Sequence, residues 1–112
     1  MGDAIMRWMI LAALVLGTCQ SATAQSRQFF VSGNDLYEVC QTKSADCVGF
    51  ITGVADALEA LPASMRGTCR PKGVALEQVL DFAVQTLRDN PTTRHEPAFD
   101  LLAKAFVETW PC

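Results

Sequence analysis

The chain has 112 residues, half of them hydrophobic, and its 9 basic and 12 acidic side chains give a formal net charge of −3. A chain of this length forms one small domain, which buries a thin core and often needs covalent crosslinks. The basic side chains form no patch, which argues against nucleic acid as a partner, whereas a mildly acidic surface permits pairing with a basic protein surface.

Residues 1–24 have the three-part pattern of a cleavable secretory signal. Arg7 precedes an uninterrupted apolar run at 8–16, and the small residues at 22–24 provide a cleavage site. The apolar run is shorter than the roughly 20 residues that span a bilayer, so a retained membrane anchor ranks below a cleaved signal. We therefore expect a signal peptide over 1–24 and an exported domain over 25–112 with no membrane span.

Two helices are predicted at the start of the exported domain. The first covers about 34–42, and the hydroxyl of Ser32 suits its start. Its buried positions are predicted to be Leu36, Val39 and Cys40. The second helix covers about 47–61, with Asp46 as its cap. Apolar side chains recur along it at the helical period, and they are Cys47, Phe50, Ile51, Val54, Ala55 and Leu58.

Small residues form a second line along the 47–61 helix, because Gly49, Gly53 and Ala57 lie at four-residue spacing. Two glycines inside a helix cost roughly 1 kcal/mol each relative to alanine, so we expect close packing against another backbone to offset them. Acidic residues interrupt the apolar run and argue against a dimer of membrane-spanning helices. The line is therefore predicted to pack tightly, either inside the domain or across a homodimer.

The second half of the exported domain is predicted to hold an irregular, locally basic loop over 62–73 and two further helices. One helix covers about 75–89 and stops at Pro91, and the other begins at Pro97. The apolar stripe of the 75–89 helix consists of Leu76, Val79, Leu80, Ala83 and Leu87. The inner face of the last helix consists of Phe99, Leu102, Ala103, Phe106 and Trp110, widened by Leu101 and Ala105. The fold class is thus all-α, a small four-helix, disulfide-stapled single domain.

Four cysteines follow the predicted signal, and an even set in a small exported domain is typical of two disulfides formed outside the reducing cytosol. Cys40–Cys47 would close the corner between the first two helices, and Cys69–Cys112 would tie the loop to the carboxyl terminus, so we favour this pairing. The main alternative pairs Cys47 with Cys112 and Cys40 with Cys69, because spacing alone does not decide connectivity. Cys19 leaves with the signal, and a lipoprotein that retains it is a minor alternative.

The sequence offers no catalytic or metal-binding constellation. His95, the only histidine, lies in a polar link without a predicted partner that would position it as a base. A cysteine nucleophile or a zinc site needs free thiols, which the disulfides consume, and no Cys-x2-Cys spacing occurs. The acidic pairs Asp56/Glu59 and Glu77/Asp81 are predicted to be solvated helix surface. We expect no enzyme activity, no metal and no cofactor, so a hydrolase is the least favoured class.

Seven stretches of the exported domain resemble the Rap1a/Tai family. They are 30–36 (FVSGNDL), Cys40, 47–57 (CVGFITGVADA), 69–74 (CRPKGV), the helix end at 87–91 (LRDNP), 94–95 (RH) and 110–112 (WPC). The blocks are fairly specific in combination, and the resemblance covers nearly the whole exported domain.

The resemblance implies a small, exported, disulfide-bonded helical protein that serves as an immunity protein of the type VI secretion system. Characterised members of the family bind and inhibit peptidoglycan amidase effectors in the periplasm, and they are often dimers. Ala75 departs from the family pattern, which more often has a capping Thr or Ser there, and this weakens a helix start by about 1 kcal/mol. The implied partner is an effector amidase, and the implied location is the periplasm.

Two classes of function follow. In the first, the chain is a periplasmic inhibitor whose 62–73 loop fills the active-site cleft of the effector, with Met65, Arg66 and Arg70 as contacts, while the line of small residues supports self-association. In the second, it is a disulfide-stabilised periplasmic chaperone or envelope adaptor that exposes apolar helix faces. A chaperone binds many unrelated clients, whereas an immunity protein is selective for one partner.

Overall fold

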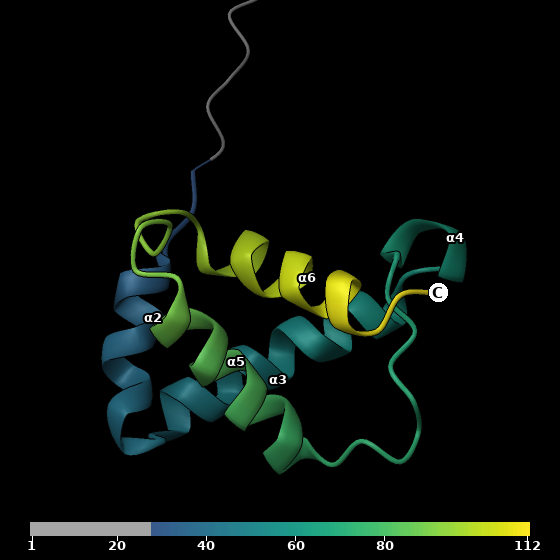
Figure 1. The fold of residues 1–112 in the computed structure, drawn as a ribbon, viewed down its shortest axis with the longest axis horizontal. Coiled ribbons are helices and arrows are strands. Elements are labelled where there is room, and N and C mark those ends of the chain that lie inside the picture. The colour runs from purple at the N-terminus through teal and green to yellow at the C-terminus, as the bar shows by residue number, and fades with distance from the viewer. Residues whose placement is uncertain (1–27) are drawn as a thin grey trace, which may run out of the picture.

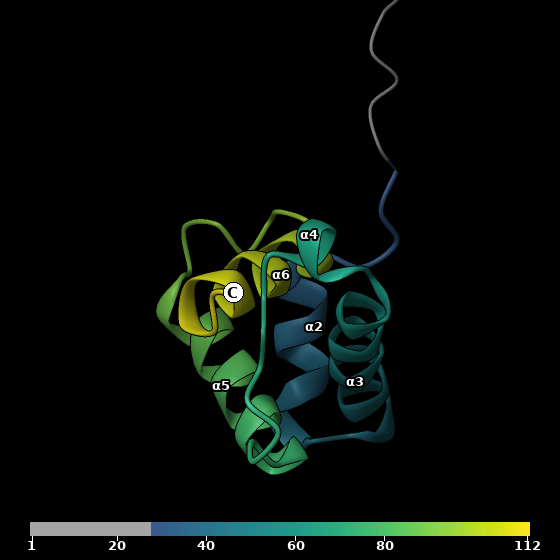
Figure 2. The ribbon, with the colours of Figure 1, turned by 90° about the vertical axis from the view of Figure 1, so that its right-hand side faces the viewer.

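The computed structural model describes residues 28–112, and the signal peptide predicted over 1–24 lies outside the described residues together with Cys19. Within the described part the fold is all-α, as predicted, and it contains no strand. Each of the four longer helices contacts the other three, while α4 lies at one edge (Figures 1 and 2). The elements are α2 (Gly33–Val39), the 3-10 turn η1 (Cys40–Thr42), α3 (Ala45–Ala60), α4 (Ala63–Arg66), α5 (Leu76–Asp89) and α6 (Ala98–Thr109).

A reciprocal cap starts α2. The hydroxyl of Ser32 accepts a hydrogen bond from the backbone N–H of Asp35 at 3.1 Å, and the Asp35 carboxylate accepts from the backbone N–H of Ser32 at 3.0 Å. These bonds lower the pKa of Asp35, since they favour its charged form. The chain continues through η1 and turns at Lys43, which has a left-handed backbone with φ of 49°.

Gly33 is required where α2 meets the link before α6. Its backbone N–H donates to the carbonyl of Glu96 at 2.8 Å, and the next N–H, of Asn34, donates to the carbonyl of Arg94 at 2.7 Å. A Cβ at Gly33 would lie 2.7 Å from that Arg94 oxygen and 2.5 Å from the Leu101 Cδ1. Only a residue without a side chain allows the two backbones to approach this closely.

Ser44 caps α3, so the predicted Asp46 cap is wrong. The hydroxyl of Ser44 accepts from the backbone N–H of Cys47 at 3.3 Å, and Asp46 lies in the first turn instead. The helix therefore begins two residues earlier than predicted, at Ala45. It ends where predicted, because Leu61 precedes a proline and adopts an extended backbone with ψ of 149°.

The core contains most of the predicted apolar stripes. Ile51, Ala83 and Leu102 are fully buried where α3, α5 and α6 meet. Three side chains that were predicted to face the core are instead more than a third exposed: Val39, Leu76 and Phe99. Leu76 and Phe99 lie in the first turns of α5 and α6. Phe50, Leu101, Ala103 and Trp110 pack against the core but are only partly buried.

The two disulfides follow the favoured pairing. Cys40 bonds to Cys47 across the η1–α3 corner, and both side chains are buried. Cys69 bonds to Cys112 and thereby joins the segment after α4 to the end of the chain. Among residues 28–112, no helix combines the length and the apolarity that crossing a bilayer requires.

Candidate functional site

The predicted irregular loop contains an ordered helical turn, α4, that projects from one end of the helix bundle (Figures 1 and 2). The carbonyl of Pro62 accepts from the backbone N–H groups of Met65 at 2.8 Å and Arg66 at 3.2 Å. Met65 is 70% exposed, so its apolar side chain is accessible on the surface of the turn. The prediction of an irregular segment was therefore wrong for these residues, whereas the contact role of Met65 stays a prediction.

Arg66 lies inward rather than toward solvent. Its Nη1 donates to the backbone carbonyl of Glu59 at 3.0 Å and lies 3.7 Å from the carboxylate of the same residue. The carbonyl belongs to the last turn of α3, where backbone oxygens have no partner within the helix. The side chain of Arg66 thus fastens α4 to α3 and is less available for a partner than predicted.

The segment after α4 is attached to the carboxyl end of α6. Gly67 has φ of 67°, a left-handed conformation that ends α4 at low steric cost. The backbone N–H of Cys69 donates to the carbonyl of Trp110 at 2.8 Å, next to the disulfide to Cys112. Arg70 follows and is half-buried. The turn that carries the exposed methionine is therefore attached at both of its ends.

An apolar groove of about 460 Å³ lies on a different face, along α3. Gly49, Gly53 and Ala57 form its floor and are exposed, and Phe30, 99% exposed, contributes to its wall. The full lining also includes Phe29, Val31, Phe50, Val54 and Phe99. The four-residue spacing identified the floor, but the sequence did not indicate that Phe29, Phe30 and Phe99 line the same groove, because they come from two segments distant from α3.

The small residues on this floor do not pack within the domain. A Cβ added at Gly49 or Gly53 would meet no atom within 4 Å. Of the two alternatives from the sequence, packing inside the domain is wrong for Gly49 and Gly53, since the described residues leave both open. The remaining alternative from the sequence is packing against a second molecule.

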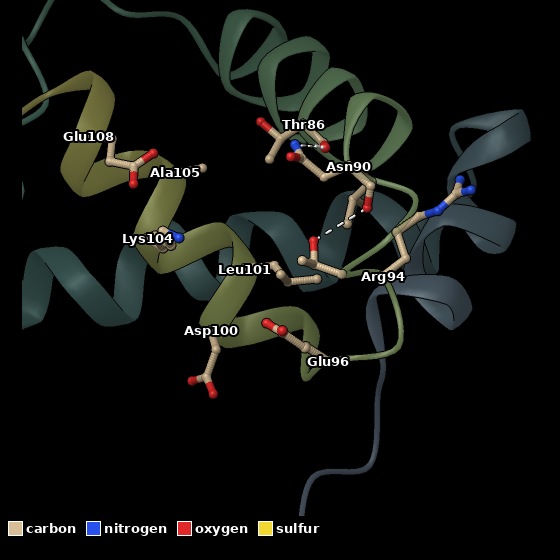
Figure 3. Close-up of a pocket in the computed structure, with 11 residues that line it drawn as sticks. Thr86, Asn90, Arg94, Glu96, Asp100, Leu101, Lys104, Ala105 and Glu108 are labelled. Atoms are coloured by element: carbon tan, nitrogen blue, oxygen red, sulfur yellow. Dashed lines mark hydrogen bonds between the residues drawn. The ribbon is translucent and has the colours of Figure 1, made fainter.

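A smaller, polar cavity of about 260 Å³ lies between α5, the link that follows it, and α6 (Figure 3). Its acidic lining residues are Glu96, Asp100 and Glu108, beside Lys104, and Figure 3 shows Asp100 directed away from the others. Arg94 contributes to the rim, but its guanidinium lies 4.2 Å from the ring centre of Tyr37 on α2. The cavity was not predicted, because its residues come from three separate elements.

The described residues hold no metal-binding cluster, and the titratable side chains considered from the sequence are exposed. Within residues 28–112, no three His, Cys, Asp or Glu side chains gather as a metal site would require. His95 is exposed and does not line the polar cavity. Glu77 and Asp81 are exposed on α5, where Lys43 lies 3.9 Å and 3.1 Å from their carboxylates. Two surface features are candidates for contact with a partner, namely the α4 turn and the apolar groove.

Comparison with known proteins gives one match, to the family described as Rap1a immunity proteins, over residues 32–112. The matched segment includes every described helix and both disulfides. No curated protein and no solved structure matches the chain.

Proposed function

The chain belongs to the Rap1a immunity protein family, and we propose that it is a non-enzymatic, periplasmic immunity protein of the type VI secretion system. Its proposed target is a peptidoglycan amidase effector, which it inhibits by filling the active-site cleft. The single observation that carries this proposal, beyond the family, is an exposed methionine on an ordered turn that projects from the helix bundle.

The α4 turn suits occlusion of a cleft because it is ordered before binding. Arg66 fastens it to α3, and the Cys69–Cys112 disulfide fastens the following residues to the end of α6. A segment that is already in its bound conformation loses less entropy when it binds. Met65 supplies a flexible, polarisable apolar side chain that can fit an irregular cleft.

The three predicted contact residues have different roles in this proposal. Met65 is the central contact, and Arg70, half-buried beyond the disulfide, contributes charge at the edge of the contact surface. Arg66 acts indirectly, because its guanidinium is occupied by the carbonyl and carboxylate of Glu59.

Co-purification with a candidate peptidoglycan amidase effector tests the proposal. The wild-type chain should retain the effector, and Met65→Asp should weaken binding at least tenfold, since a charge in a desolvated contact is strongly unfavourable. Leu76→Asp is the matched control, because Leu76 is also exposed and apolar but lies on α5, away from the turn. Equal loss in both variants, or retention of many unrelated proteins by the wild type, rejects the proposal, and the second outcome favours the chaperone alternative.

We also propose that Gly49, Gly53 and Ala57 form a self-association surface. The exposed small residues let a second backbone approach closely. When two copies pack face to face, the aromatic side chains around these residues would be buried away from water. Gly53→Arg should yield a monomer by analytical ultracentrifugation. Gly73→Arg should not, although a side chain at Gly73 also meets no atom within 4 Å. A wild-type chain that is monomeric at high concentration contradicts the proposal.

A further inference from the structure

Thr68 is the one polar or charged side chain that is buried among residues 28–112, with 4% of its surface exposed. It lies at the base of the projecting turn, between Gly67, which ends α4, and Cys69, which forms the disulfide. A hydroxyl is buried without a penalty only when it forms hydrogen bonds, so its partners define what it does.

The hydroxyl of Thr68 contacts the last turn of α6. Its Oγ1 lies 3.1 Å from the carbonyl oxygen of Phe106 and 3.1 Å from that of Trp110, and it donates to this pair. The backbone of Thr68 also forms an isolated antiparallel bridge with Pro111. The two acceptors of the hydroxyl lie 38 and 42 positions away in the sequence. These contacts therefore join the turn to a distant part of the chain.

We infer that Thr68 is a positioning residue, whose hydroxyl sets the orientation of the α4 turn on α6 and so presents Met65 in a fixed direction. The consequence for partner binding rests on the proposed function, whereas the orientation of the turn does not. The disulfide between Cys69 and Cys112 limits how far the two segments separate. The hydroxyl adds direction, because a hydrogen bond weakens steeply when its angle changes.

Thr68→Val isolates this role, because valine keeps the shape of threonine and removes only the donor. Both carbonyls keep another donor in the variant: the backbone N–H of Trp110 lies 2.8 Å from the Phe106 oxygen, and that of Cys69 lies 2.8 Å from the Trp110 oxygen. No buried carbonyl loses its last partner, so we expect the domain to fold.

Amide hydrogen exchange of the free, disulfide-bonded protein tests the inference. Loss of one hydrogen bond should raise the population of molecules in which the turn is open by about fivefold. Thr68→Val should therefore accelerate exchange at Met65, Arg66 and Cys69 by about that factor. Thr68→Ser should restore wild-type exchange. Thr52→Val is the matched control, because the Thr52 hydroxyl donates to Val48 within α3 and should leave these amides unchanged. Unchanged exchange in Thr68→Val, or uniform acceleration in all helices, overturns the inference.

The effector that co-purifies with the wild-type chain provides a second measurement. Thr68→Val should lower the association rate constant in proportion to the fraction of molecules in which hydrogen exchange shows the turn displaced, and Thr68→Ser should not lower it. An association rate constant that does not fall with this fraction rejects the step from orientation to binding. If no effector binds the wild type, the proposed function fails, and hydrogen exchange alone still decides whether Thr68 orients the turn.

Discussion

Removal of the Cys69–Cys112 disulfide should destabilise the domain strongly. The bonded cysteines are 43 residues apart, and the chain-entropy model gives about 4 kcal/mol for a closed loop of that size. The variant is the double substitution Cys69→Ser/Cys112→Ser, because replacing only one of the two cysteines would leave the other as a free thiol. Cys112 is exposed and Cys69 is half-buried, so the substitution adds little cost from burying hydroxyls. Most of the loss should therefore come from the greater freedom of the unfolded chain.

Urea unfolding followed by tryptophan fluorescence measures this loss. Trp110 lies 5.5 Å from the ring of Phe82 and 5.7 Å from that of Phe106, so its emission reports the packing of α5 against α6. The native emission should be nearly unchanged in the double variant, because the hydrogen bonds of Thr68 remain. Its free energy of unfolding should fall by about 3–4 kcal/mol. If the free energy of unfolding decreases by less than about 1 kcal/mol, this crosslink does not constrain the unfolded chain as the pairing requires.

Three further predictions concern the helix bundle. Leu102→Ala should lower the free energy of unfolding by roughly 2–5 kcal/mol, whereas Leu76→Ala should have a much smaller effect because Leu76 is exposed; similar losses in thermal melts would contradict the assigned core. Gly33→Ala should destabilise the domain by about 1–3 kcal/mol because the added Cβ meets a backbone oxygen, whereas Gly49→Ala should stabilise α3. Urea midpoints of the two variants that move in the same direction would be inconsistent with this. Hydrogen bonds from the cap of α2 lower the pKa of Asp35 below 3.8, so its contribution to stability is present above that value and is lost as the pH falls through the folded-state pKa. Asp35→Asn should therefore reduce the difference between unfolding free energies measured at neutral pH and near pH 3, and an unchanged difference would count against this cap.

Apolar periodicity predicted α3, α5 and α6 because each of them buries a stripe of apolar side chains against the others, whereas α2 buries only Gly33 and Leu36. The ends were less predictable. Asp46 and Ser44 both suit a helix cap, and the extended backbone at Ser44 decides between them. The α4 turn has only four residues, Ala63–Arg66, which is too short for any periodic pattern to indicate.

The candidate surfaces were only partly predictable, since each combines residues that are distant in the sequence. The four-residue spacing of Gly49, Gly53 and Ala57 identified the groove floor, but its wall at Phe99 depends on how α6 begins beside α3. The buried role of Thr68 depends on the last turn of α6, which the local sequence around the turn does not indicate.

We propose that this protein acts by placing its ordered α4 turn in the cleft of one amidase. A titration of the effector with the wild-type chain, measured as the release of peptidoglycan fragments, is the decisive assay. We expect hydrolysis to stop near a stoichiometric ratio and to continue in the presence of Met65→Asp. Complete hydrolysis at a large excess of the wild-type chain would refute the proposed mode of action.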